Sequence, residues 1–215
     1  MSTKLAKENI LQKIKQALKT PVPMPFVANE TNTNYFFQPS VQALEIEFAE
    51  NFTKLLGKFC FCANEDELAV QLNDLTLAKK WNKVFCNESE IKNKLINKGF
   101  NNLHYAHLND CDASITTCES LIARTGSILL SSANQSGRSA SVYAPVHVCI
   151  AYTNQLVYDI QHALIKIQKD YSTHLPSLIT LATGPSRTAD IEKTLVVGVH
   201  GPKEVYLFLV DEQNM

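Results

Sequence analysis

The stretch Val146-His147-Val148-Cys149-Ile150-Ala151-Tyr152 is a nearly continuous apolar run. A run of this length is much shorter than a membrane span and is typical of a strand that is buried on both faces of a parallel sheet. It predicts that the chain folds around a buried sheet and that the remaining elements pack on either side of it.

The segments on both sides of this run alternate between helical and strand patterns. Downstream, apolar residues at helical spacing predict a helix over 156–167, and three apolar stretches predict strands over 178–182, 195–199 and 205–210. Upstream, the expected helices cover 41–55, 64–74, 88–98 and 115–123, and the expected strands cover 58–62, 83–86 and 127–131. This alternation predicts an α/β sheet that is covered by helices on both faces.

The first 39 residues differ in pattern from the rest. Lys4–Leu18 carries apolar residues at helical spacing, and the run Pro21-Val22-Pro23-Met24-Pro25 ends this helix. Residues 21–39 follow as an extended arm rich in proline, asparagine and threonine, which is free to wrap its own body or a partner. The sequence therefore predicts an N-terminal helix and arm over residues 1–39 and one α/β domain over residues 40–215.

The composition is that of an ordinary globular protein. Of the 215 residues, 45% are hydrophobic and 19% are charged, and the formal net charge is -1. These values exclude the disordered and collagen-like classes, and the balanced charge gives no reason to expect nucleic acid or an anionic membrane as a partner. The start of the chain lacks the continuous apolar stretch of a signal or a membrane span, so we expect a cytoplasmic location and no membrane insertion.

No metal or cofactor is expected to bind this chain directly. Six cysteines are scattered through the expected strands and loops without a C-x-x-C pair, so they are interpreted as small buried hydrophobic side chains of a reducing compartment. The span 104–112 collects residues of metal-ligand type at a spacing that matches no standard site. These residues are His104, His107, Asp110, Cys111 and Asp112.

The first candidate site lies after the expected strand 178–182, in a stretch that the sequence predicts to open a helical turn. Such a junction exposes unpaired backbone N–H groups, and in open parallel sheets it lies at the carboxyl edge, where ligands bind. Its hydroxyl and glycine residues are candidates to bind a carboxylate or a phosphate: Thr183, Gly184, Ser186 and Thr188, with Arg187 beside them. The alternative is that these hydroxyls only cap a helix.

The turn Gly198-Val199-His200-Gly201-Pro202 holds the best candidate histidine. His200 is flanked by glycines on a loop whose backbone can approach a ligand, and its charge changes near neutral pH. Asp190 and Glu192 are candidates to orient this histidine or to act with it as acid and base. The alternative is that both acidic residues only complement a helix dipole.

Two further positions complete the predicted site. Arg138, in the loop before the central apolar run, offers the planar fork that suits a carboxylate or a phosphate. Thr125 and Gly126 join an expected helix to a strand, where a plain C-cap is the alternative interpretation. His147 is interpreted as a core histidine. We expect Arg138, His200 and residues 183–188 to surround an anion at the carboxyl edge.

Four motifs occur together in a familiar order, and they are Ala123–Ser127, Gly137–His147, Thr183–Glu192 and Gly198–Pro202. With them the chain resembles the LUD domain family and its lactate utilization protein C (LutC) group, over roughly residues 40–211. The resemblance implies a three-layer α/β/α fold similar to the NagB/RpiA/CoA-transferase group. It also implies a role in oxidising L-lactate to pyruvate together with two partner proteins that carry iron–sulfur clusters, with this chain as the cluster-free component.

One residue departs from the family pattern. The family often has Glu-Thr-Gly where this chain has Arg124-Thr125-Gly126, so a possible acid or base is replaced by a fixed cation. Glu119 is a substitute only if the helix presents it to the same cleft.

The leading hypothesis is an accessory subunit of an L-lactate-oxidising complex. The alternatives are a stand-alone enzyme or binding protein for a small carboxylate, a sugar phosphate or an acyl-CoA, and an interaction module that uses the arm.

Overall fold

The computed structural model describes residues 2–17, 19, 40–103, 107–188 and 196–212, and it divides the chain into two units, Met1–Pro39 and Ser40–Met215. In the first unit, α1 (Ser2–Ala17) confirms the predicted helix. Its apolar side chains Ile10, Leu11 and Ile14 are all about half exposed. The predicted arm over residues 21–39 lies outside the described residues.

The second unit is built around a parallel sheet of five strands. These are β1 (Lys58–Cys62), β2 (Val84–Phe85), β3 (Ala113–Thr116), β6 (Val146–Tyr152) and β11 (Glu204–Val210). Their order across the sheet is β1-β11-β6-β3-β2, and every neighbouring pair is parallel. The apolar run 146–152 is thus β6, the central strand of this sheet, with β11 and β3 on its two sides. The predicted α/β class is confirmed.

The side chains of β11 alternate between two hydrophobic cores, because successive residues of a strand point to opposite faces. Tyr206, Phe208 and Val210 belong to one core, and Val205, Leu207 and Leu209 belong to the other. The sheet is therefore buried on both faces, as the apolar pattern predicted.

Two helices, α3 (Glu65–Lys79) and α4 (Ser89–Asn97), cover the first face. The start of α3 is fixed by Asn64, whose side chain accepts a hydrogen bond of 2.9 Å from the backbone N–H of Glu67. The Glu67 carboxylate accepts in return from the N–H of Ala63, at 2.7 Å. This reciprocal cap confirms the helix start that the sequence predicted.

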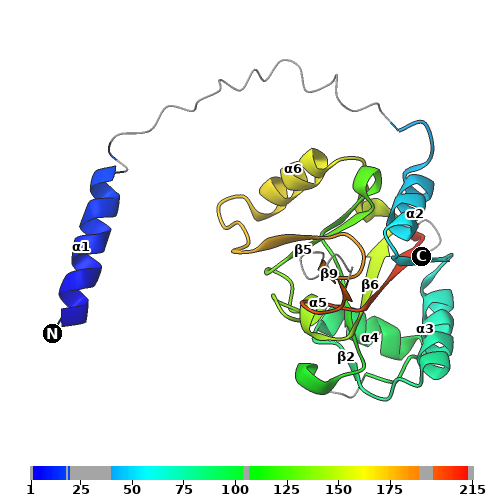
Figure 1. The fold of residues 1–215 in the computed structure, drawn as a ribbon. Coiled ribbons are helices and arrows are strands. Elements are labelled where there is room, and N and C mark those ends of the chain that lie inside the picture. The colour runs from blue at the N-terminus through cyan, green and yellow to red at the C-terminus, as the bar shows by residue number, and fades with distance from the viewer. Residues whose placement is uncertain (1, 18, 20–39, 104–106, 189–195, 213–215) are drawn as a thin grey trace. The chain divides into compact units, whose positions relative to one another are not determined.

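The second face is covered by α2 (Leu44–Lys54) and by a second sheet, which is backed in turn by α6 (Ile160–Tyr171), drawn in yellow in Figure 1. The strands of the second sheet, in spatial order, are β7 (Leu156–Val157), β4 (Ser120–Ile122), β5 (Ser127–Ser131) and β8 (Ile179–Ala182). Leu121 packs toward the central sheet, whereas Ile122 packs toward α6.

The predicted helix over 115–123 is wrong. This segment contains the end of β3 and all of β4, and a bend between them carries the chain from the central sheet to the second sheet. Residues 114–116 are almost completely buried on both faces of the strand. Because all the positions are buried, the sequence lacks the alternation that distinguishes a strand from a short buried helix.

Short elements complete the second unit. They are α5 (Ala140–Tyr143), the strands β9 (Arg187–Thr188) and β10 (Val196–Val197), and the 3-10 turns Leu108–Asp110, Ala123–Thr125 and Thr153–Gln155. In the described part of the chain, no helix is long and apolar enough to cross a bilayer.

Candidate functional site

Four of the predicted site residues come together at one end of the β5–β8 ladder. The hydroxyl of Ser127 lies 2.8 Å from that of Thr125 and 2.9 Å from that of Thr183, so the three hydroxyls form a chain of hydrogen bonds. Gly126 and Gly184 follow Thr125 and Thr183 directly. The structure therefore joins two sequence motifs through Ser127, which the predicted site did not include.

Both glycines pack against the C-terminal part of α2. Gly126 has φ +59°, and a Cβ atom there would lie 2.5 Å from the backbone N of Phe52. Gly184 has φ +77°, and its Cβ would lie 2.3 Å from the carbonyl oxygen of Leu55. Gly126 also ends the turn Ala123–Thr125 in the left-handed conformation, which agrees with the C-cap alternative. At both positions the backbone conformation and the close approach of α2 require glycine.

The predicted helical turn after β8 is wrong. Arg187–Thr188 instead form β9, which pairs with β10 in an antiparallel hairpin. The N–H of Ser186 donates to the carbonyl of Pro202 at 3.0 Å, and the N–H of Gly198 donates to the carbonyl of Ser186 at 2.9 Å. These backbone groups are thus already paired, and they do not form the anion-binding helix start that was expected.

The remaining residues of this candidate site are placed as follows. An ideal Cβ atom on Gly201 would lie 3.0 Å from the Cβ of Ser186, so the two turns of the hairpin base are in contact. His200 lies exposed in the turn between β10 and β11. Asp190 and Glu192 lie outside the described residues.

Arg138 lies away from the Thr183 cluster. Its guanidinium donates to the hydroxyl of Ser177 at 2.5 Å, just before β8 begins. Thr183 lies six residues further along this extended chain, a separation of about 20 Å at the usual rise of a strand. The expected grouping of Arg138 with residues 183–188 around one anion is therefore not present.

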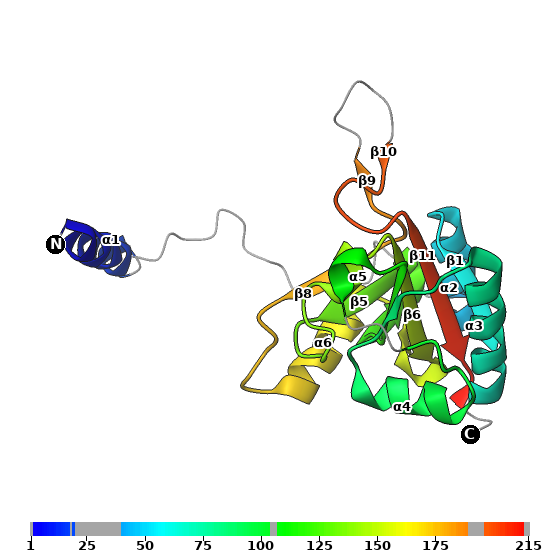
Figure 2. The ribbon, with the colours of Figure 1, turned by 90° about the horizontal axis from the view of Figure 1, so that it is seen from below.

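The predicted position at the carboxyl edge is also wrong for His200 and Arg138. His200 precedes β11 and Arg138 precedes β6, so both belong to loops at the amino edge of the parallel sheet. The N–H of Lys203 donates to the carbonyl of Pro145 at 2.8 Å, which joins these two loops. Figure 2 shows the β9–β10 hairpin beyond the end of the sheet where β11 begins, with the arrowhead of β11 at the opposite end.

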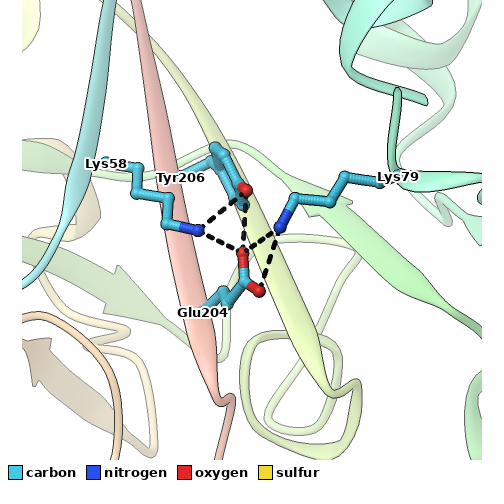
Figure 3. Close-up of polar contacts among 4 residues, drawn as sticks. All are labelled: Lys58, Lys79, Glu204 and Tyr206. Carbon is cyan, nitrogen blue, oxygen red and sulfur yellow. Dashed lines mark hydrogen bonds and ion pairs between the residues drawn. The ribbon is translucent and has the colours of Figure 1, made fainter. Parts of the chain in front are cut away.

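A charged cluster that the sequence analysis missed also lies at the amino edge (Figure 3). The carboxylate of Glu204, the first residue of β11, accepts hydrogen bonds from Lys58, Lys79 and the phenol of Tyr206. The Lys79 ammonium lies 2.9 Å from this carboxylate. Because both lysines are paired with Glu204, the cluster ties β1, β11 and α3 together and is not an open anion site.

The carboxyl edge of the sheet holds a polar pocket of about 370 Å³. It lies beyond the ends of β3 and β6 and beside the start of α4, and a second cavity of about 420 Å³ shares Glu88, Glu90 and Thr117 with it. In open α/β sheets this edge is where ligands bind. The pocket is lined by Glu88, Glu90, Ile91, Lys94, Thr117, Tyr152, Asn154, Gln155, Lys166 and Glu212.

One wall of this pocket is a network around Tyr152, the last residue of β6. The phenol donates to Glu65 at 2.8 Å, and the Lys94 ammonium lies 3.3 Å from the phenol oxygen and 3.4 Å from the Glu65 carboxylate. Burial and the neighbouring Glu65 raise the pKa of Tyr152 to about 12, so the phenol stays protonated. For Lys94, burial lowers the pKa, but Tyr152 and Glu65 raise it above its ordinary value.

Glu88 connects the loops that form the floor of the pocket. Its side chain is 7% exposed, and its carboxylate accepts from the N–H of Thr117, with both oxygens at 3.1 Å. It also accepts from the hydroxyls of Thr117 and Ser136. Every hydrogen bond of this buried charge therefore serves to hold the loops after β2, β3 and β5 in place.

The free polar groups of the pocket combine both signs of charge. Lys94 is already paired with Glu65 and lies 3.6 Å from Glu90. Lys166, from α6, has no ion-pair partner among the residues that the structure describes. This arrangement presents an ammonium for a ligand carboxylate, and carboxylates and amides that accept from a ligand hydroxyl.

A sequence signal for this pocket was available. Asn87-Glu88-Ser89 follows the expected strand 83–86, and Thr117 follows β3, so polar residues occur directly after two strands. The same rule, that ligands bind at the carboxyl ends of parallel strands, favours these positions over loops that precede a strand.

Two observations concern metals and thiols. Within the described ranges, no group of three or more His, Cys, Asp or Glu side chains is arranged to hold a metal ion. All six cysteines are free, and five of them are buried, as the sequence predicted, while Cys60 is half-buried.

His147 is buried in the core, and its Nε2 lies 2.8 Å from the Thr116 hydroxyl, whereas its Nδ1 has no hydrogen-bond partner among the described residues.

Comparison with known proteins gives a consistent result. The chain is similar to proteins named Lactate utilization protein C, with 38% identity over 103 residues to that of Shouchella clausii and 34% over 118 residues to that of Bacillus subtilis. These matches cover 47% and 54% of this chain, and 45% and 48% of the relatives, so the chain spans about half the length of the curated relatives it matches.

A solved structure and a family match complete the comparison. The crystal structure of a DUF162 family protein from Deinococcus radiodurans has a TM-score of 0.60 at 18% identity, and the match covers 78% of this chain and 96% of that one. This likeness supports the fold alone. The LUD domain matches residues 46–210, which include both sheets and, apart from Glu212, the lining of the carboxyl-edge pocket. The chain belongs to the LUD domain family.

Proposed function

We propose that this chain serves lactate utilization, as a component of a system that oxidises L-lactate to pyruvate together with iron–sulfur partner proteins. Membership of the LUD domain family and the similarity to several proteins named Lactate utilization protein C support the role. Oxidation of lactate to pyruvate removes two electrons and two protons, so the reaction requires an acceptor. The proposal assigns the electrons to the clusters of the partners.

The cysteines of this chain support the assignment of the clusters to the partners. They lack the C-x-x-C spacing of cluster-binding motifs, and five of the six are buried. In this proposal the chain binds no cofactor itself and contributes a site for the small carboxylate.

The observation that carries the site is the mixed charge of the carboxyl-edge pocket. A 2-hydroxy acid needs a cation for its carboxylate and an acceptor for its hydroxyl. Lys166 supplies the cation, and the carboxylates of Glu90 and Glu212 supply acceptors on the same lining. The proposal therefore places the hydroxy acid between α6 and the start of α4.

Thermal unfolding with and without millimolar L-lactate, D-lactate or pyruvate tests this site. Because a ligand that binds only the folded state raises the midpoint, L-lactate should raise it for the wild type. Lys166→Ala should abolish this rise, whereas Lys169→Ala, also on α6 but outside the pocket, should retain it. An unchanged midpoint in the wild type, or an equal response of both variants, would contradict the assigned site.

The role in the system needs a separate experiment. The chain is purified with its native partners, and lactate-dependent electron transfer is measured with and without it. We expect the rate to fall when the chain is omitted and to return when it is added back. Equal rates would contradict the accessory role, and lactate turnover by the isolated chain would favour the alternative of a stand-alone enzyme.

A further inference from the structure

An apolar groove of about 530 Å³ lies between α2 and β1, outside the pocket described above. Ile46 and Ala49 line it from α2, at positions i and i+3 on one face of the helix, and Phe59 and Phe61 line it from the same face of β1. Ile46 is 53% exposed and Phe61 is 48% exposed. Large apolar side chains grouped in this way on a surface mark an interaction site.

Acidic residues surround this groove. Glu45, Glu50 and Asp211 line it directly, and Glu212 lines an adjoining cavity that shares Glu45 and Thr153 with it. Among the described residues, no lysine or arginine lines either cavity. The Lys54 ammonium lies 3.9 Å from Glu50, but both side chains of this pair are more than half exposed, so it offsets little of the negative charge.

We propose that this groove binds an amphipathic helix of a partner protein, with apolar side chains on one face and lysine or arginine on its flanks. The apolar floor between a helix and a strand fits the apolar face of such a helix, which is a common mode of recognition. The acidic rim then faces the basic flanks, and this complementarity selects the partner and speeds its association.

The charge of the rim argues against the other occupants. A second copy of the chain would place this face against itself in a two-fold interface, with Glu45, Glu50 and Asp211 opposite the same acidic residues. An anionic membrane surface would be repelled by the same three carboxylates. A basic helix is the occupant that satisfies both the apolar floor and the acidic rim.

The groove lies near the carboxyl-edge pocket. The adjoining cavity shares Asn154 and Glu212 with that pocket and shares Glu45 and Thr153 with the groove, so it lies between the two. A partner that is docked in the groove is therefore held beside the pocket. This consequence rests on the proposed function, whereas the docking itself does not.

Fluorescence anisotropy with the full chain and a labelled synthetic peptide tests the docking. The peptide is an amidated helix of about 18 residues, with leucines at i, i+3, i+4 and i+7 and lysines elsewhere, and its matched control carries glutamate in place of lysine. We expect the lysine peptide to bind, to lose affinity as salt is added, and to bind at least about tenfold more tightly than the glutamate peptide.

Variants then locate the binding surface. Phe61→Asp, Ile46→Glu and the double variant Glu45→Lys, Glu50→Lys should each weaken binding at least about tenfold. Leu77→Asp and Asp74→Lys make the same kinds of change on the exposed face of α3 and should leave the affinity unchanged. Thermal midpoints show which variants remain folded, and the exposed Ile46 on α2 provides an apolar test if Phe61→Asp does not fold.

Three results would overturn the proposal. One is a lysine peptide that does not bind at millimolar concentration or binds no better than the glutamate peptide. Another is an affinity that the groove variants leave unchanged. The third is a wild-type dimer that Phe61→Asp converts to a monomer, because a second copy of the chain would then cover the groove. None of these measurements involves lactate, so their failure is distinct from failure of the lactate-binding site.

Discussion

The phenol of Tyr206 donates a hydrogen bond to the carboxylate of Glu204, two residues earlier on the same strand, over a distance of 2.7 Å. Partial burial of Glu204 raises its pKa, but the hydrogen bonds from Lys58, Lys79 and Tyr206 outweigh burial and lower the pKa to about 2. The hydrogen bond to Glu204 is also the largest cause that raises the pKa of Lys79 to about 12. The cluster is thus charged over a wide range of pH.

These shifts predict how stability depends on pH. The contribution of Glu204 is fully present above its unfolded pKa of 4.5 and is lost as the pH falls toward 2. The contribution of Lys79 is fully present below 10.5 and is lost as the pH rises through about 12. At pH 7, Glu204→Gln should lower the free energy of unfolding by about 1 kcal/mol, since the cluster is partly exposed. Urea unfolding of both proteins between pH 2 and 7 should show this difference shrinking below pH 4.5.

His147 gives a second dependence on pH, at higher pH values. Burial lowers the pKa of its imidazole from 6.5 to about 4, so the folded state holds the neutral ring. The wild type should lose stability as the pH falls from 6.5 to 4, with a slope of at most about 1.4 kcal/mol per pH unit. Denaturant unfolding of His147→Gln, which carries no titrating ring, should lack this part of the slope. Parallel pH profiles for the two proteins would contradict the prediction.

Gly126 and Gly137 allow the stability cost of an unfavourable backbone conformation to be measured apart from the cost of a steric clash. Their φ angles are +59° and +62°, but a Cβ on Gly126 meets the backbone of Phe52, whereas a Cβ on Gly137 meets nothing within 4 Å. Gly137→Ala should cost about 1 kcal/mol of unfolding free energy, and Gly126→Ala should cost at least about 2 kcal/mol more. Chemical denaturation of both variants measures the difference, and equal losses would mean that α2 moves aside easily.

Glu88 and Glu90 form a matched pair in the carboxyl-edge pocket. Glu88 is buried and holds Thr117 and Ser136, whereas the Glu90 side chain is 87% exposed. Glu88→Gln replaces one carboxylate oxygen with an NH₂ group, which would face the donors of Thr117 or Ser136. The substitution should therefore lower the free energy of unfolding by about 2 to 3 kcal/mol. Glu90→Gln should change stability by less than about 0.5 kcal/mol. Thermal and urea unfolding check both values, and similar losses would show that Glu88 does not hold the loops.

The elements with a clear period were predictable from the sequence. Asn64 and Glu67 fixed the start of α3, and the apolar run 146–152 identified a buried strand. In the second sheet the predicted strands 127–131 and 178–182 are confirmed as β5 and β8, but β4 was not predictable, because it is short and completely buried. A helical turn was predicted where Arg187–Thr188 form β9, because Thr183 to Glu192 has the hydroxyl and acidic residues of a helix start. The pairing of these two-residue strands depends on Val196 and Val197, which lie eight and ten residues after their partners Thr188 and Arg187.

The candidate site was predictable only in part. The sequence grouped Thr125, Gly126, Thr183 and Gly184, and the structure joins them through Ser127. The sequence alone does not show at which edge of the sheet a loop lies, because that depends on the directions of the strands. Once β6 and β11 are known to be parallel, the loops before them, with Arg138 and His200, must lie at the amino edge. The pocket at the other edge is built by side chains from five separate segments.

The position of β11 has a consequence for how the protein is made. This strand emerges from the ribosome after all the other strands of the central sheet, yet it lies between β1 and β6 and supplies side chains to both cores. During synthesis β1 and β6 therefore have no shared neighbour, and their facing edges stay open, which favours pairing with other chains. The nascent chain can complete its sheet only when residues 204–210 have left the exit tunnel, so a chaperone that shields β1 until then should raise the yield of folded protein.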